Sequence, residues 1–140
     1  MTFELKPYIG ISDFCFGATQ AQMKKVGGEA ALIEIDNIMK ETREQRSGMI
    51  FGYRKRRLVW ISVSKHVPIT LNGNLIFPDC NPLEVLSAYD KVIEGSNGTL
   101  LFKQLGICLS GFTKKRIPEG KLLIAFAKEM LPFYEGYIDV

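Results

Sequence analysis

The segment GMIFGYRKRRLVWISVSKHVPITLNGNLIF, residues 48–77, predicts the centre of an antiparallel β-sheet. Its apolar runs are rich in β-branched and aromatic residues, which favour strands over 49–53, 58–64, 69–71 and 75–77. The basic run 54–57 separates the first two strands. Asn72 and Gly73 separate the last two, because Asn-Gly is the preferred pair in a two-residue hairpin turn. Pro68 has no N–H to donate, so we expect the sheet to pause at 66–68.

Alternation along 58–64 assigns the two faces of the second of these strands. It places Val59, Ile61 and Val63 on one face, which we expect to be the core face, and Trp60 and Ser62 on the other.

Two short helices flank this central segment. Thr19 followed by Gln22 forms a capping-box pattern, and the glycine pair at 27–28 ends the helix that it begins. Asn81, followed by Pro82 and Glu84, predicts the start of a second helix. Further strands are expected at 3–5, 99–102, 106–109 and 122–127.

Two segments are ambiguous. Residues 31–42 fit a helical stripe about as well as a strand; we favour a strand that begins near Leu32 and is irregular by Asn37. The aromatic, acidic tail at 133–140 is either a contact surface or an edge strand that packs Phe133 and Tyr137 into the core. Together these elements predict one α+β domain over residues 1–140, with a curved antiparallel sheet of about six strands and two short helices on one face.

Composition agrees with a folded protein of ordinary type. The chain has 140 residues, of which 46% are hydrophobic and 24% are charged. Its net charge of +3, from 18 basic and 15 acidic residues, is too small to indicate nucleic-acid binding by bulk charge. The three cysteines are far apart and form no Cys-x-x-Cys pair, which is typical of free thiols in a reducing cytoplasm. We also expect no signal peptide and no membrane span.

No motif in the chain predicts catalysis, a metal site or a bound cofactor. His66, the one histidine, has no nucleophile or orienting acid near it in the sequence, so a strand-end position explains it better than a catalytic one. Paired carboxylates at Glu34 and Asp36 more often lie on a solvated face than act as acid and base. We therefore expect that the protein is not an enzyme.

The basic clusters support an alternative prediction. A nucleic-acid-binding module would combine charge with stacking on nearby aromatic rings. Its cations would be Arg54, Arg56, Arg57, Lys114, Lys115 and Arg116.

The order of the segments FELKPYIGISDFCFGATQAQMKKVGG (3–28), PITLNGNLIF (68–77), LLFKQLGICLSGF (100–112) and FYEGYIDV (133–140) resembles that of small bacterial immunity proteins. These proteins belong to polymorphic toxin systems, including contact-dependent growth inhibition and Rhs-type toxins. The resemblance covers nearly the whole chain and implies a cytoplasmic protein that binds and neutralises a cognate toxin C-terminal domain, possibly a nuclease. It implies no catalytic or cofactor-binding residues. Many immunity proteins against nucleases are acidic, and this chain departs from them in being slightly basic.

Surface side chains of the types common in protein interfaces are the predicted partner contacts. The oligomeric state and the identity of the toxin stay open. The candidates are Glu34, Asp36, Glu41, Glu44, Arg54, Arg56, Tyr134, Glu135, Tyr137 and Asp139.

Overall fold

A computed structural model describes residues 2–78, 81–96, 98–112 and 121–138, and it confirms a mixed α+β fold with mostly antiparallel sheets. Within these residues there are thirteen strands in two sheets, more than the predicted six. None of the helices in the described ranges is long and apolar enough to cross a membrane.

The larger sheet has eight strands, all antiparallel to their neighbours. Their order across the sheet is β10 (Ile93–Glu94), β11 (Leu100–Phe102), β12 (Ile107–Ser110), β13 (Leu122–Phe126), β7 (Arg57–Ser64), β6 (Met49–Arg54), β5 (Glu41–Arg46) and β4 (Leu32–Asp36). The smaller sheet has the order β3 (Phe14–Cys15), β2 (Gly10–Ile11), β1 (Phe3–Lys6), β8 (Ile69–Leu71) and β9 (Asn74–Phe77). Its β1–β8 pair is the parallel one.

A two-residue turn joins β8 to β9, as predicted, and another joins β6 to β7 within the basic run. Both residues have positive φ in the β6–β7 turn at Lys55 and Arg56 and in the β8–β9 turn at Asn72 and Gly73. The β5–β6 turn at residues 47–48 has the same geometry. Positive φ at both positions suits the right-handed twist of the paired strands. The basic run is therefore the tip of a hairpin, as the sequence indicated.

The polar run 41–46 is a strand that the sequence pattern did not predict. It forms β5 and pairs along its whole length with β6. Residues 32–36 form β4 and end in a turn at 37–40, which confirms the prediction of a strand there.

Both predicted helices are present. In α1 (Gln20–Gly27) the Thr19 side chain accepts from the Gln22 amide at 3.2 Å, and the Gln22 side chain accepts from the Thr19 amide at 2.9 Å. In α2 (Pro82–Ser87) the Asn81 side chain accepts from the Glu84 amide at 3.4 Å. Met23 of α1 and Leu86 of α2 are buried in the same core.

A third helix replaces the predicted edge strand in the tail. A short 3-10 helix, η1 (Lys128–Met130), leads directly into α3 (Leu131–Ile138). Helical spacing buries Tyr134 and Ile138 and leaves Phe133 and Tyr137 exposed, so the expectation that these last two rings pack into the core is wrong.

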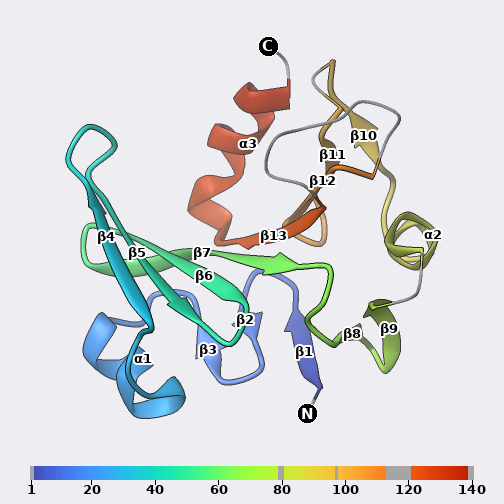
Figure 1. Ribbon diagram of the computed structural model, residues 1–140. Helices are drawn as coiled ribbons and strands as arrows, with labels where there is room; N and C mark the ends of the chain where they lie inside the picture. The colour runs from blue at the N-terminus through green and yellow to red at the C-terminus, as the bar shows by residue number, and fades with distance from the viewer. Residues whose placement is uncertain (1, 79–80, 97, 113–120, 139–140) are drawn as a thin grey trace.

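The large sheet separates two hydrophobic cores. The inner core lies between the two sheets, and the outer core lies under α3 on the opposite face, as the arrangement in Figure 1 makes clear. A register shift in the β6–β7 pairing puts Val59 and Trp60 both in the outer core, while Ile61 and Val63 remain in the inner one. The prediction that Val59 shares a core face with Ile61 and Val63 is therefore wrong, because strict alternation breaks at this bulge.

Candidate functional site

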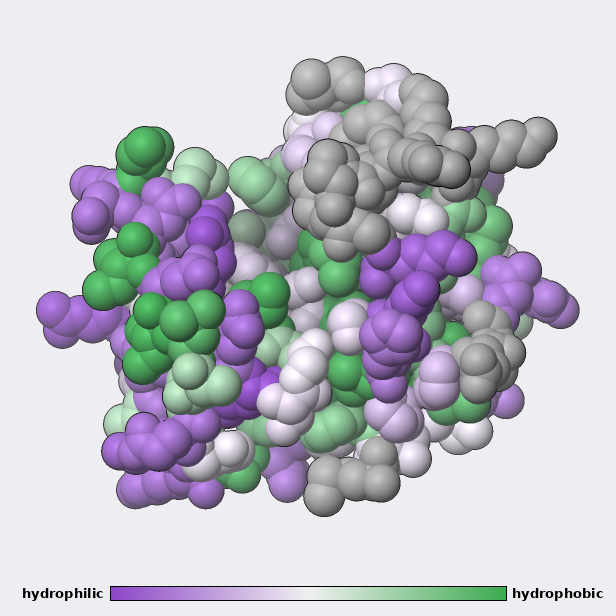
Figure 2. Space-filling view, in the orientation of Figure 1, coloured by the Kyte–Doolittle hydropathy of each residue, from purple (hydrophilic) through white to green (hydrophobic). Residues whose placement is uncertain are grey.

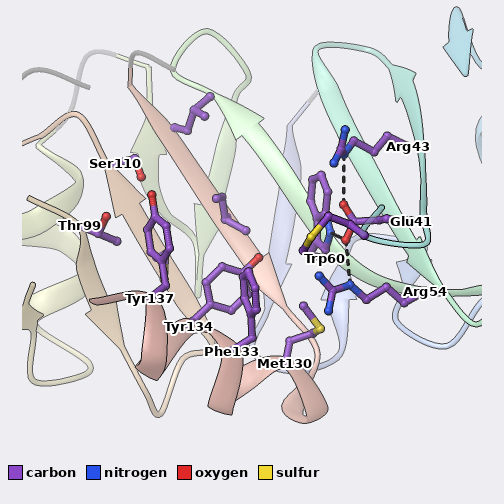
Figure 3. A pocket seen from close by; sticks show the side chains of 14 residues that line it. Glu41, Arg43, Arg54, Trp60, Thr99, Ser110, Met130, Phe133, Tyr134 and Tyr137 are labelled. Carbon is purple, nitrogen blue, oxygen red and sulfur yellow. Dashed lines mark hydrogen bonds and ion pairs between the residues drawn. The ribbon is translucent and has the colours of Figure 1, made fainter. Parts of the chain in front are cut away.

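A groove lies on the outer face of the large sheet, between α3 and the arm, by which we mean β4, its turn and β5 (residues 32–46). It encloses about 390 Å³, which is within the size range of ligand and side-chain pockets. Figure 3 shows charged side chains on the arm side and aromatic rings on the helix side. The lining residues are Met39, Glu41, Arg43, Arg54, Trp60, Thr99, Cys108, Ser110, Leu122, Ile124, Met130, Phe133, Tyr134 and Tyr137.

Glu41 organises the arm side of the groove. Its side chain is only 6% exposed, and its Oε1 accepts a hydrogen bond from Arg43 Nε at 3.1 Å. Its Oε2 accepts from Arg54 Nε at 2.9 Å and from Trp60 Nε1 at 3.0 Å. Two guanidinium groups and an indole are therefore held in fixed positions by one carboxylate, because charge-assisted hydrogen bonds are strong and directional.

The indole of Trp60 lies against a strand residue that has no side chain. Gly52 is opposite Trp60 in the β6–β7 ladder, and a Cβ built on Gly52 would lie 1.9 Å from a ring carbon of the indole. The ring can therefore lie across β6 and direct its N–H to Glu41 only because position 52 is glycine.

The helix side of the groove is aromatic. Tyr134 is buried and stacks on Phe126 of β13, with ring centroids 4.4 Å apart. Phe133 lies beside it and faces the Arg54 guanidinium carbon, which is 5.1 Å from the ring centroid. Glu135 of α3 forms an ion pair at 2.7 Å with Lys103, which lies in the turn between β11 and β12. The aromatic side of the groove is thus anchored by packing and by charge.

The titratable groups in the deepest part of the groove are held in their neutral forms. Burial raises the pKa of the Cys108 thiol to about 12. Burial, followed by the charges of neighbouring groups, also raises the pKa of Tyr134. Neither group supplies an anionic nucleophile near neutral pH, since a thiolate and not a thiol is the reactive species. The groove is suited to packing against a ligand and to directed hydrogen bonds.

We expect Cys108 to resist alkylation in the folded protein. Treatment with iodoacetamide at pH 8, followed by peptide mass spectrometry, should label the exposed Cys15 at least about a hundred times faster than Cys108, because Cys108 is both buried and almost fully protonated. In denaturant the two rates should become similar. Equal labelling in the native protein would show that the floor of the groove is open to solvent.

The predicted acidic contacts fall on two different faces of the arm. Glu34 and Asp36 share the outer face, as their spacing indicated, and Glu41 joins them because it lies opposite Asp36 in the β4–β5 ladder. Asp36 accepts from two amides of the 37–40 turn, and its pKa is lowered, first by the Met39 amide and also by Arg43. Glu44 points inward and is 3% exposed, so it lies outside the surface that a partner would reach.

The remaining predicted contacts are distributed between the groove and its surroundings. Arg54, Tyr134 and Tyr137 line the groove together with Glu41, whereas Glu135 is paired with Lys103 behind it. Arg56 is exposed at the tip of the β6–β7 turn. Asp139 lies outside the described residues.

The alternative basic site is only partly described. Arg54 is bound to Glu41, and Arg57 donates to the carbonyl of Gly17 at 3.2 Å. Lys114, Lys115 and Arg116 lie outside the described residues, so nucleic-acid binding stays a prediction. His66 is exposed in the turn after β7, outside the groove.

Sequence reasoning missed ten of the fourteen residues that line the groove, among them Met39, Arg43, Trp60 and Phe133. The spacing of Arg43 two residues after Glu41 was the available signal for Arg43, because alternate residues of a strand lie on the same face. Trp60 was assigned to packing; it also donates a hydrogen bond to Glu41 and lines the groove.

No protein-family model, curated protein or solved structure matches this chain. In the described part of the chain, no cluster of His, Cys, Asp and Glu side chains is arranged to hold a metal ion.

Proposed function

We propose that this chain is an immunity protein, which binds a cognate toxin domain and blocks its active site or substrate entry, and that the groove and the arm form the contact surface. The resemblance in segment order motivates the kind of partner. The distribution of exposed apolar side chains is the observation that carries the proposal of protein binding.

Exposed large hydrophobic residues are concentrated on the arm, on both of its faces, and on α3. Of the twelve in the described residues, five lie within 32–39 and two more, Phe133 and Tyr137, lie on α3. Ile38 is 92% exposed and Ile35 is 70% exposed. Green side chains gather over the arm on the left of Figure 2, with purple ones between them. Exposed apolar side chains that cluster among polar ones are typical of a protein-interaction site.

The groove also carries the residue types that dominate binding energy in protein interfaces. Tryptophan, tyrosine and arginine are enriched among such residues, and here Trp60, Tyr137 and Arg54 line one cavity. Arg54 is held by Glu41 before any partner arrives, so little side-chain entropy remains to be lost on binding. A projecting side chain of the partner, apolar or aromatic, would fit between Met39 and the rings of α3.

Co-expression tests this function. The probe is the C-terminal domain encoded by the gene immediately upstream, expressed with and without this chain in a host that the domain alone inhibits. We expect growth to be restored and a complex to co-purify. If growth is not restored and no complex co-purifies, the proposal is wrong.

A paired substitution tests the surface. Phe133→Ala with Tyr137→Ala should weaken binding about thirtyfold or more, since truncation of central aromatic contacts commonly costs 2 kcal/mol or more. Leu75→Ala with Ile93→Ala is the matched control, because both residues are exposed but lie outside the groove. An equal loss of affinity in the two double variants would contradict a contact at the groove.

A further inference from the structure

Among the described residues, β4 forms the outer edge of the large sheet. β4 pairs with β5 on one side and is the last strand of the sheet on the other. Its five residues pair with β5 in unbroken register, and it contains no proline, no lysine and no bulge. Proteins commonly protect an edge strand with such features or with charged side chains, because free N–H and C=O groups accept a further strand. On β4 the charges are those of Glu34 and Asp36 alone.

Both faces of β4 carry exposed apolar side chains. Ile33 and Ile35 lie on the inner-core side of the sheet, beyond the part that the core covers, and Leu32 lies on the groove side. A strand added at this edge would cover all three, since cross-strand and diagonal neighbours lie within reach of one another. At this edge, apolar side chains are therefore left uncovered on both faces of the sheet.

The charge of the edge favours one kind of occupant. Both charged residues of β4 are acidic, although the chain as a whole has a net charge of +3. Arg43, the residue directly opposite Glu34 on β5, is engaged by Asp36 at 3.1 Å and by Glu41 at 3.1 Å. Glu34 makes no ion pair among the described residues. An incoming strand with a cation opposite Glu34 would supply one.

The same charges oppose pairing of β4 with a second copy of itself. A two-fold pairing along the whole strand would place Glu34 directly opposite the Glu34 of the other copy. Shifting the two-fold centre to Ile35 would place Glu34 opposite Asp36. Like charges directly opposite one another destabilise a strand pair.

We propose that β4 accepts a β-strand from a partner protein, and that this strand alternates basic and β-branched residues, with Lys or Arg opposite Glu34 and apolar residues opposite Ile33 and Ile35. Backbone hydrogen bonds supply affinity in this mode of recognition, and alternate side chains supply specificity. The inference rests on the proposed function in taking a second protein as the partner, and it concerns the free edge of β4 within the arm, not the groove.

The test uses the whole chain and short capped peptides. A fluorescently labelled peptide with the core Lys-Val-Lys-Val-Leu should bind saturably in the micromolar range by anisotropy, and it should slow amide hydrogen exchange at Leu32–Asp36. A peptide with Glu in place of both Lys should bind at least tenfold more weakly. The basic peptide N-methylated at alternate residues should lose binding, because it keeps its charge but cannot pair through its backbone.

Charge reversal in the protein provides the matched comparison. Glu34→Lys should lower the affinity for the basic peptide at least tenfold and raise the affinity for the acidic one. Glu94→Lys should change neither affinity by more than twofold. Glu94 is exposed on β10, at the opposite edge of the same sheet.

Three results would overturn the inference. They are the absence of saturable binding, equal binding of the N-methylated peptide, and a dimer in sedimentation that Ile33→Lys dissociates, since a second copy would then occupy the edge. None of them bears on toxin rescue by co-expression, so failure at this edge and failure of the proposed function are distinguishable.

Discussion

Replacing Glu44 with glutamine should lower the free energy of unfolding by about 3–5 kcal/mol, the cost of leaving a buried charge without its partner. The Glu44 carboxylate accepts from Arg46 Nη1 at 2.7 Å, from the Tyr53 hydroxyl at 2.6 Å and from Gln20 Nε2 at 3.1 Å. Arg46 is itself 5% exposed and cannot move its charge into water without disturbing the inner core. Chemical denaturation of the two proteins, monitored by circular dichroism, measures the difference.

A double substitution separates the charge effect from packing. Glu44→Leu with Arg46→Met removes both charges and should recover most of the stability lost in Glu44→Gln, because well-packed apolar residues commonly replace a buried ion pair at little cost. A double variant as unstable as the single one would show that the hydrogen bonds of this network, including Arg46 to the Gly28 carbonyl at 2.9 Å, matter more than its charge balance.

The pH dependence of stability reports the same carboxylate. Burial alone would raise the pKa of Glu44, but hydrogen bonds from Arg46, Tyr53 and Gln20 lower it below its ordinary value. A lowered pKa in the folded state stabilises the protein above the ordinary value, near 4.5, and this stabilisation is lost as the pH falls through the folded-state pKa. The acid decline in stability should therefore be shallower in Glu44→Gln. Asp36, whose pKa is also lowered, is present in both proteins, so its contribution cancels when the two pH profiles are compared.

Gly52→Ala should lower the free energy of unfolding by about 1–3 kcal/mol, as expected for overpacking of a filled site. The new Cβ would meet the Trp60 ring within 1.9 Å, so the indole has to move and its hydrogen bond to Glu41 has to break. Trp60 is the one tryptophan of the chain, so its fluorescence reports this movement directly. We expect the emission maximum to shift to the red as the ring becomes more exposed.

Gly136→Ala is the matched control for this prediction. Position 136 is inside α3, and a Cβ there would meet nothing within 4 Å. The same chemical change should leave the fluorescence unaltered and stabilise the helix by up to about 1 kcal/mol. An unchanged emission spectrum in Gly52→Ala would contradict the contact between Trp60 and β6.

The elements that sequence reasoning predicted well are those with strong local signals. The capping residues Thr19 and Asn81 located both helices, and the Asn72-Gly73 pair located a hairpin, because each motif satisfies backbone groups or a φ requirement within a few residues. The strand at 32–36 was also identified, although its composition allowed a helix.

The elements that were missed depend on contacts between distant segments. β5 is polar along its length, because Glu44 and Arg46 are buried as a pair and Glu41 and Arg43 line the groove. Its burial pattern therefore cannot be read from hydropathy. The tail forms a helix because Tyr134 stacks on Phe126, a contact that only the sheet provides. The groove itself could not be predicted, since it needs the arm and α3 to be placed on the same face.

The bulge in β7 links the groove to the interior of the molecule. Because Val59 and Trp60 face one core while Ile61 and Val63 face the other, a single strand holds both sides of the large sheet together. Loss of packing in one core would therefore be transmitted through β7 to the other. Sequence change on the groove side is then constrained by its effect on stability, and substitution is least costly on β4, which contributes no residue to either core.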